Sequence, residues 1–439
     1  MDPKERWRRL KSGCGFQRPS TAESESDHRD FSSALKRRAV WEHFRRARST
    51  TPEILTSGYG TYTSGIIGDT VETPYGTCFV RTTWIEPSPK WDWETLRHIP
   101  ASLFRPSDAH VTGTLDQWIF IDVETTGLAG GAGTIPFMIG WAHYEDGGLS
   151  IHQGFLRDLD EEPALLHHLL EHLNNAAGII TYNGSAFDRH VLHNRMVLNR
   201  MPTDFLEYPH LDLFHWVRRI WQRRWPSVTL QAVENYFLHE SREMDLKGSE
   251  IPAVYRWYLR HGWHDALYTV FEHNLQDIRS LAALTLRLGL CLRGSENLPE
   301  PDDQAILHWH MGRLWLEKDW RQSMDLWTDL LEKPDVPPKY RSRALIATLR
   351  LLRRKKRYET LPRILQRLET LSPEHLSPHA WVTAAFYAYR FRRDRSRAIQ
   401  WLKTALTHDA VPSDKRQRWQ QRLDRLHQKI QRPLHQDQK

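Results

Sequence analysis

The pattern of secondary structure along the chain changes once, and this change constrains the fold more than any other feature. Residues 118–290 alternate between short apolar runs and amphipathic segments, which is typical of a sheet with helices packed on it. After a polar, proline-containing connector at residues 293–303, only helical patterns remain. We therefore predict an α/β domain over residues 118–292 and an all-helical domain over residues 303–439.

The order of strands in the α/β part predicts a mixed sheet. Strands are expected at residues 118–122, 135–143, 149–155 and 178–182, with an amphipathic helix at 163–173 before the last of them. Strands joined by short turns pair antiparallel, whereas a crossover helix joins parallel strands. Helices are expected to cover the faces of this sheet, at residues 186–199, 212–221, 228–238, 252–259 and 266–288.

The residues before this domain show weaker patterns of secondary structure. Residues 1–50 are rich in Arg, Ser, Glu and Asp and contain few apolar positions, so we expect a flexible leader there. Residues 51–117 alternate short apolar runs with turn motifs such as TPYG at 73–76. This alternation predicts a small β-rich N-terminal segment.

Size and composition exclude several classes of protein. The 439 residues exceed what one hydrophobic core normally spans, and 40% hydrophobic with 26% charged residues argues against a wholly disordered, collagen-like or membrane-embedded chain. No stretch reaches the roughly 18 apolar residues of a membrane span, and the first residues lack the apolar core of a secretion signal. The three cysteines are far apart and form no C-x-x-C pair, so neither a disulfide framework nor a cysteine zinc site is expected. We expect a soluble, cytoplasmic protein that binds no membrane.

Charge is distributed unevenly along the chain. Residues 301–439 contain 29 basic and 16 acidic side chains, whereas residues 118–290 contain 14 basic and 21 acidic ones. A basic segment beside an acidic one fits a protein in which one part attracts a polyanion and the other gathers carboxylates around cations. Well-solvated arginine-rich helices would give the same distribution, so charge alone does not name a partner.

The helical part contains three segments that can be laid over one another. They cover residues 307–331, 344–368 and 380–406, with a step of about 38 residues. Such helical hairpins cannot bury their apolar faces alone and stack on their neighbours. They resemble tetratricopeptide repeats, although that family repeats every 34 residues or so. We expect the tryptophans of this region to pack in its core rather than to stack on bases: Trp309, Trp315, Trp320, Trp327, Trp381 and Trp401.

Three short motifs carry acidic residues in positions suited to chemistry. In FIDVETTGL, Asp122 and Glu124 lie two apart on a strand, so both side chains point to the same face. An exposed edge strand would also tolerate this pair, but the apolar residues around it are typical of an interior strand. Two uncompensated carboxylates there would cost several kcal/mol, so a shared proton or bound cations must relieve their repulsion.

The second and third motifs follow further along the chain. In TYNGSAFD a strand ends in the turn Asn183-Gly184 and a helix then carries Asp188, whose alternative role is to stabilise the start of that helix. In HNLQDI, His273 and Asp277 lie four apart and therefore on one helix face, where they could also form only a surface contact.

Together, the three motifs resemble those of the DEDD-type, DnaQ-like 3′–5′ exonucleases of the ribonuclease H-like fold. The similarity covers residues 115–290 and is best to the YprB-like branch, which ETTGLAGGAG and KGSEIPAVYRWYL also resemble. The resemblance implies a ribonuclease H-like mixed sheet with flanking helices and a 3′–5′ exonuclease acting on DNA or RNA. The helical repeats would hold nucleic acid or a protein partner.

The resemblance also implies roles for individual residues. Its four metal-binding carboxylates fall on Asp122, Glu124, Asp188 and Asp277, and hard oxygen ligands of this kind select Mg²⁺ or Mn²⁺, here two ions. His273 is the candidate general base. It lies four residues before the last Asp, the spacing of the family's tyrosine branch, whereas Glu272 lies at the histidine spacing, so a helix-face contact to Asp277 remains its alternative role. Contacts to the terminal nucleotide are implied for Thr125, Thr126, Leu128, Asn183 and Phe187.

Other interpretations fit the sequence less well. Asp212 in HLDLFHW resembles an acidic residue of this branch but could equally cap its helix, so it is left out of the site. The glycines after Thr126 lack the G-x-G-x-x-G spacing of a dinucleotide loop. HLLEH at residues 168–172 matches the H-x-x-E-H pattern of inverted zinc peptidases, but a chain with 24 histidines is expected to contain such a match by chance. An endonuclease of the same fold and a non-catalytic scaffold remain the alternative functions.

Overall fold

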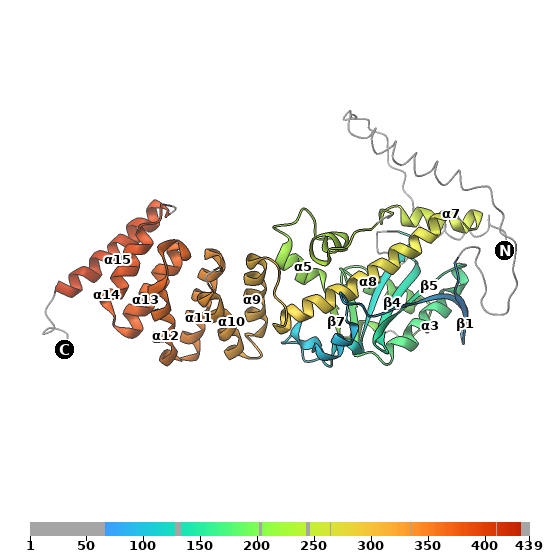
Figure 1. The fold of residues 1–439 in the computed structure, drawn as a ribbon, viewed down its shortest axis with the longest axis horizontal. Coiled ribbons are helices and arrows are strands. Elements are labelled where there is room, and N and C mark those ends of the chain that lie inside the picture. Colours follow the sequence, from blue (N-terminus) through green and yellow to red (C-terminus); the bar gives the residue numbers. More distant parts are fainter. Residues whose placement is uncertain are drawn as a thin grey trace, which may run out of the picture. The chain divides into compact units, whose positions relative to one another are not determined.

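The computed structural model shows two compact units (Figure 1). The first unit holds residues 66–101, 110–217 and 227–288, and the second holds residues 102–109, 218–226 and 289–431. The expected leader, and the expected β-rich segment as far as residue 65, lie outside the described residues. The structure describes residues 66–127, 133–201, 204–242, 246–263, 265–333, 335–409 and 411–431.

The first unit is built on a seven-stranded sheet with the order β1-β2-β5-β4-β3-β6-β7. The first five strands of this order pair antiparallel, whereas β3, β6 and β7 run parallel to one another. The predicted mixed sheet is therefore confirmed. Its strands are β1 (Asp69–Thr73), β2 (Gly76–Ile85), β3 (Trp118–Thr125), β4 (Pro136–Glu145), β5 (Gly148–Phe155), β6 (Gly178–Thr181) and β7 (His210–Asp212).

Two features of this sheet differ from expectation. Strands β1 and β2, which come from the expected N-terminal segment, extend the main sheet through the pairing of β2 with β5. Strand β7 was not expected; it ends at Asp212, where a helix was expected to begin, and it pairs with β6. Three residues are too few to produce a periodic pattern in the sequence, and the strand exists because β6 leaves an edge for it to pair with.

Helices cover both faces of the sheet, and the strand register shows which residues face them. Helix α8 crosses the face that carries Asp122 (Figure 1), and the Gln153 side chain on that face donates to the backbone oxygen of Phe271 at 2.7 Å. Helix α3 covers the other face, where a Cβ on Gly154 would lie 2.1 Å from Leu165. The α- and π-helices that lie wholly or partly in this unit are α3 (Glu162–Leu173), α4 (Asp188–Leu198), α5 (Phe214–Trp221), α6 (Leu230–Val233), the π-helix η6 (Glu234–Leu238), α7 (Ile251–His261) and α8 (Asp265–Arg293).

The second unit is helical throughout its described residues from 301 onward, apart from turns, as predicted. Helix α9 packs against α10, and α13 packs against α14, as two hairpins. The bounds of its helices are α9 (Pro301–Trp315), α10 (Trp320–Glu332), α11 (Pro338–Lys355), α12 (Leu361–Arg367), α13 (Pro378–Arg392), α14 (Arg395–Leu406) and α15 (Ser413–Gln431).

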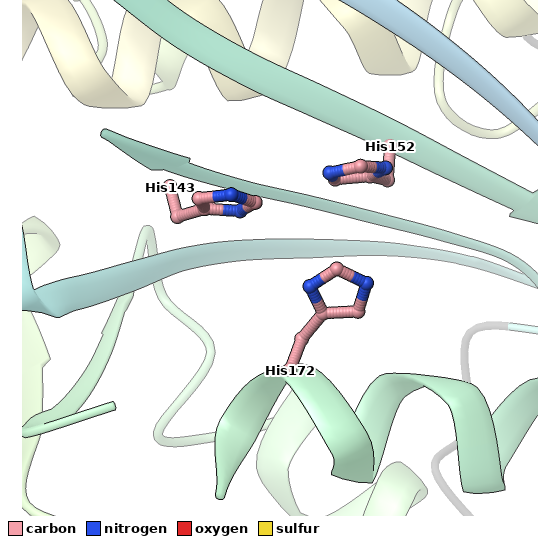
Figure 2. Close-up of side chains that lie close together, drawn as sticks. All are labelled: His143, His152 and His172. Carbon is pink, nitrogen blue, oxygen red and sulfur yellow. The ribbon is translucent and has the colours of Figure 1, made fainter. Parts of the chain in front are cut away.

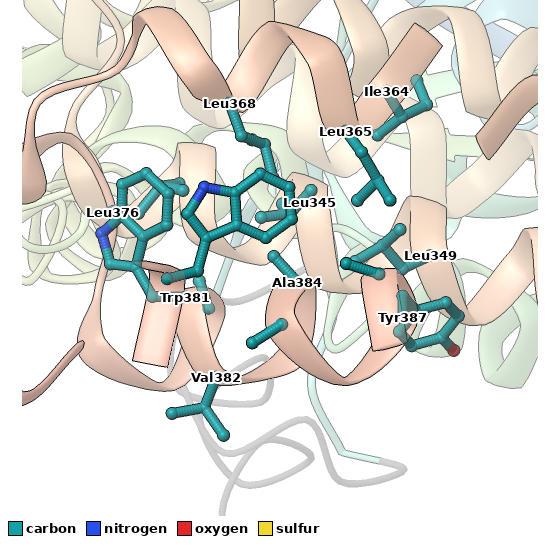
Figure 3. Packing of buried hydrophobic residues seen from close by; sticks show 14 of the residues in the cluster. Leu345, Leu349, Ile364, Leu365, Leu368, Leu376, Trp381, Val382, Ala384 and Tyr387 are labelled. Atoms are coloured by element: carbon teal, nitrogen blue, oxygen red, sulfur yellow. The ribbon is translucent and has the colours of Figure 1, made fainter. Parts of the chain in front are cut away.

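The apolar faces of these helices form a core of their own. Figure 3 shows Trp381 of α13 beside Leu345 of α11 and Leu368, which follows α12, so three consecutive helices share one core. Trp327 and Trp401 are each 2% exposed, and Trp309 and Trp320 pack against the same core from partly buried positions. The expectation that the tryptophans serve packing is confirmed for Trp309, Trp320, Trp327, Trp381 and Trp401, whereas Trp315 is partly buried and is not among the residues of this core. Among the described residues, no helix is both long and apolar enough to cross a membrane.

Helices α9 and α10 approach closely at Gly312, which predicts a sensitive position. A Cβ at Gly312 would lie 2.3 Å from the indole nitrogen of Trp327. We expect Gly312→Ala to lower the free energy of unfolding by about 1–3 kcal/mol, because this overpacking outweighs the gain in helix propensity. Urea unfolding of the full chain measures the effect. Gly248→Ala, where an added Cβ meets no atom within 4 Å, serves as the control, and a Gly312→Ala variant as stable as the wild type would contradict this packing.

Candidate functional site

Strand β3 carries the first two acidic residues on an interior position of the sheet. Asp122 pairs with Gly140 of β4, Glu124 pairs with Met138, and β6 borders β3 on its other side. The alternative of an exposed edge strand is therefore wrong. Because alternate residues of a strand point to opposite faces, the Asp122 and Glu124 side chains lie on the face that α8 covers.

The parallel strand β6 ends beside these residues and leads into the third acid. A turn after β6 holds Asn183 in the left-handed region, at φ 64°. Asp188 then begins helix α4 as its first residue, rather than one turn into the helix as expected, and it is 8% exposed. A buried acid at a helix start is favoured by the helix dipole, so this position also stabilises α4.

Asp212 at the end of β7 holds that turn in place. Its carboxylate accepts hydrogen bonds from the backbone nitrogens of Asn183, at 2.8 Å, and Ser185, at 3.0 Å. It also accepts from the nitrogen of Phe214 at 3.1 Å, at the start of α5. Asp212 therefore positions the segment that leads to Asp188, and its charge contributes to raising the pKa of Asp188.

Helix α8 brings His273 and Asp277 against the same strand. His273 Nε2 lies 3.6 Å from Glu124 Oε1 and 3.4 Å from Asp277 Oδ2. The side chains of His273 and Asp277 are 11% and 17% exposed, so they form no mere surface contact. Ligand atoms of Glu124, His273 and Asp277 all lie within 4.8 Å of one another.

Asn274, which the sequence motifs did not single out, joins α8 to the first acid. Its Nδ2 donates to Asp122 Oδ2 at 2.9 Å, and its Oδ1 accepts from Gln153 at 3.1 Å. A Cβ at Gly140 would lie 2.3 Å from that Oδ1, so only glycine leaves room for this amide. The absence of a side chain at Gly140 therefore makes room for Asn274 beside Asp122.

Arg242 is the second residue that sequence reasoning missed, and it places a cation among the acids. Its side chain is 6% exposed and ion-pairs with Asp277 and, at 2.7 Å, with Glu234 of η6. Burial alone would lower the pKa of Arg242, but the hydrogen bonds to Glu234 and the charge of Asp277 raise it above its usual value. Arg242 Nη1 also lies 3.2 Å from His273 Nδ1.

The acids repel one another strongly in this setting. Burial raises the pKa of Asp122 to about 7, and the charge of Asp277 adds to the effect. Burial likewise raises the pKa of Asp188 well above its ordinary value, with the Asp122 charge contributing, and raises that of Asp277 although His273 and Arg242 act against it. A cluster of hard carboxylate oxygens that is costly to charge fits divalent cations such as Mg²⁺ or Mn²⁺.

The residues expected to contact substrate take varied positions. The Thr125 hydroxyl donates to the backbone oxygen of Gly127 at 2.7 Å, and the Thr126 hydroxyl accepts from the nitrogen of Ile135 at 3.1 Å, so both shape the loop after β3. Phe187 is half-buried directly before Asp188. Asn183 is exposed in its turn, and Leu128 lies outside the described residues.

A pocket opens beside the third motif. Its volume is about 440 Å³, and both His273 and Asp277 line it. Lys247 and Gly248, from the KGSEIP segment, lie on its rim, so this part of the sequence resemblance faces the acidic cluster. The other residues that line the pocket are Thr229, Leu230, Gln231, Arg242 and Leu246.

Comparison with known proteins agrees with this architecture. Residues 119–288 match the profile of the RNase H superfamily. The chain carries an RNase H superfamily domain. It is also 27% identical over 317 residues to the uncharacterized protein YprB of Bacillus subtilis (strain 168), a similarity that covers 71% of this chain and 73% of that protein.

The raised carboxyl pKa values predict how the stability of the RNase H superfamily domain depends on pH. Between about pH 4 and pH 7 the folded cluster holds a proton that the unfolded chain has released, so the free energy of unfolding falls as the pH rises through this window. In the presence of chelator, Asp122→Asn removes the part of this loss that Asp122 contributes. Between about pH 5 and pH 7.5 the wild type should lose at least about 1 kcal/mol more than the variant in urea unfolding. Exposed Asp160→Asn should follow the wild type, and identical slopes for wild type and Asp122→Asn would contradict the prediction.

Proposed function

We propose that this protein is a divalent-metal-dependent nuclease that hydrolyses phosphodiester bonds from the 3′ end of a nucleic acid strand. The observation that carries the proposal is that acids of β3 and α8 lie on one face of the sheet and that Asp188, at the start of α4, interacts electrostatically with Asp122. Asp122 interacts electrostatically with Asp277 and Asp188, and Glu124 shares the histidine His273 with Asp277. An RNase H superfamily domain is a fold in which such a cluster has a catalytic use.

The four acids have the chemistry to hold two Mg²⁺ or Mn²⁺ ions. Such ions lower the pKa of a bound water and neutralise charge on the departing oxygen. The carboxylates of Asp122 and Asp277 would contribute from opposite sides, since one lies on β3 and the other on α8. Asn274 keeps the Asp122 carboxylate oriented through its 2.9 Å hydrogen bond.

His273 is placed to move a proton at this site. A guanidinium only donates hydrogen bonds, so His273 Nδ1 accepts from Arg242 and the proton of the neutral ring lies on Nε2, facing Glu124 and Asp277. For His273 to act as general base, Arg242 has to release Nδ1 and free that lone pair. Cations bound by the carboxylates would take over the neutralising role of Arg242 and favour this release.

A nucleic acid substrate is supported by charge as well as by the fold. Residues 301–439 carry 29 basic against 16 acidic side chains, and basic surfaces bind phosphate backbones by releasing counterions. The helical repeats, which resemble tetratricopeptide repeats in sequence, would hold the strand or a protein partner beside the nuclease domain.

Removing single carboxylates tests the nuclease proposal. We expect Asp122→Asn and Asp277→Asn to lower the rate of Mg²⁺-dependent hydrolysis of 5′-labelled single-stranded DNA or RNA by roughly 10³-fold or more, the scale on which loss of one essential group acts. Exposed Asp160→Asn is the matched control. Hydrolysis that survives both site variants would place the activity elsewhere, cutting of circular substrates would identify an endonuclease, and no hydrolysis of any substrate with either metal would favour a scaffold.

The role of His273 is tested separately. As general base it should contribute roughly 10²–10⁴-fold to kcat, so His273→Gln should lower kcat by this factor and remove the acidic limb of the pH–rate profile. The Mg²⁺ concentration at half-maximal rate should change little, because the four carboxylates remain. If His273→Gln leaves kcat unchanged, His273 is not the general base, and its contact to Asp277 is its remaining role.

A further inference from the structure

A second cluster of metal-binding side chains lies on the opposite face of the sheet. Trp141 pairs with His152 and His143 pairs with Ser150, so both histidines share one face of β4 and β5. Asp122 pairs with Gly140, the residue before Trp141 on β4. Neighbouring residues of a strand point to opposite faces, so Asp122 points to the face opposite the two histidines. Helix α3 covers the histidine face and contributes His172.

The three histidine rings lie close together. Figure 2 shows the His143 and His152 rings side by side on their strands, with His172 reaching up to them from its helix. Nitrogen atoms of the three rings all lie within 4.8 Å of one another. In a tetrahedral site with metal–nitrogen bonds of about 2.1 Å, ligand nitrogens lie roughly 3.4 Å apart. The His143 and His152 rings are stacked, with centroids 5.3 Å apart and planes 10° from parallel, so one of these rings has to turn out of the stack for all three to bind one ion.

The surroundings of His143 resemble those of a metal ligand. Its Nδ1 is buried and has no hydrogen-bond partner among the described residues, and an unpaired buried polar atom is costly. Its Nε2 lies 3.7 Å from a carboxylate oxygen of Glu145. Metal-binding histidines usually have such a carboxylate behind the second nitrogen, which fixes the ring and strengthens the ligand. Nδ1 is therefore the atom available for a metal.

The other two rings are also suited to bind. The Thr82 hydroxyl lies 3.1 Å from His152 Nδ1 and can orient that ring, whereas the Ser150 hydroxyl, 3.2 Å from Nε2, has to turn away before Nε2 can bind a metal. Burial and the neighbouring imidazoles lower the pKa of His152 to about 3 and that of His172 to about 4, so both rings are uncharged near neutral pH. The neutral imidazole is the form that binds metals.

A pocket leads to this cluster and gives an ion a route to it. Its volume is about 470 Å³, and it is lined by His143 and His172 together with His168. His168 Nδ1 lies 3.2 Å from Glu171, so the first histidine of the H-x-x-E-H motif pairs with the glutamate of the same motif. The ligand set therefore combines one histidine of the helix with two from the sheet, which does not favour a peptidase centre.

We propose that His143, His152 and His172 form a binding site for one transition-metal ion of the zinc type, separate from the carboxylate site. Imidazole nitrogens select zinc and its neighbours, whereas carboxylate oxygens select Mg²⁺ or Mn²⁺. The ion ties α3 to β4 and β5, and its remaining coordination position faces the pocket. The proposal is independent of the nuclease function, since it concerns the other face of the sheet.

Zinc binding by the untagged, metal-free full chain tests the site. Titration calorimetry with Zn²⁺ alone should show one tightly bound equivalent that His143→Ala, His152→Ala and His172→Ala each weaken by roughly 100-fold or more. Any zinc taken up by the carboxylate site is a separate equivalent, which Asp122→Asn weakens and the three histidine variants do not. Thr82→Val, which removes a hydroxyl beside His152, should cost roughly 10-fold. His167→Ala is the matched control, because His167 lies on the same helix with 25% side-chain exposure and stacks near Tyr75 rather than in the cluster.

Two further measurements test the zinc site in the wild type even where a histidine variant fails to fold. Co²⁺ added to the wild type should give the visible absorption of a nitrogen-coordinated ion, and Zn²⁺ should raise the Tm of the wild type, whether or not a variant folds. Asp122→Asn should retain the zinc site in full. Absence of stoichiometric binding, unchanged binding in all three histidine variants, or loss of the zinc in Asp122→Asn or His167→Ala would overturn the proposal.

Discussion

Repulsion among buried carboxylates is the constraint on which the first unit depends. Strand β3 and helix α8 direct acids to one face of the sheet, Asp188 at the start of α4 interacts electrostatically with Asp122, and burial raises the pKa values of Asp122, Asp188 and Asp277. The fold tolerates this cluster because Arg242 ion-pairs with Asp277 and Asn274 donates to Asp122. Arg242 and Asn274 stabilise acids that bound cations would otherwise have to stabilise. The repulsion among the acids therefore explains both these contacts and the metal chemistry proposed for the site.

The parts of the site that the sequence predicts are those governed by local periodicity. The spacing of two between Asp122 and Glu124 and the spacing of four between His273 and Asp277 each fix a shared face within one element. The interior position of β3 also followed from its apolar neighbours. Contacts between elements that are distant in the sequence produce no periodic pattern of this kind. Arg242 and Asn274 act across 35 and 152 residues of sequence, and the bend at η6 that presents Glu234 has no periodic pattern of its own.

The helical unit was predictable for a different reason. Its apolar positions repeat at helical spacing over many turns, and large aromatic side chains such as Trp381 must find partners in neighbouring helices. This core is built without any residue of the sheet. The charged side chains of this region are mostly outside that core, so its basic excess lies largely at the surface. Among the described arginines and lysines from residue 301 onward, Arg341 is the exception, with 1% exposure, and it donates to the backbone oxygen of Lys333.

Alternation along the strands explains how one sheet can serve two kinds of metal ligand. On β3 the even-numbered residues from Trp118 to Glu124 face α8, and the matching residues of β4 are small or apolar there, which leaves Asp122 room for Asn274. The odd-numbered residues of β4 face α3 and include His143. A shift of one residue in the register would exchange the two faces of a strand. Strand register therefore keeps the carboxylates of β3 on one face and the imidazoles of His143 and His152 on the other. The sequence contained this only implicitly, because the pairing of β4 with β5 had to be known before His143 and His152 could be recognised as neighbours.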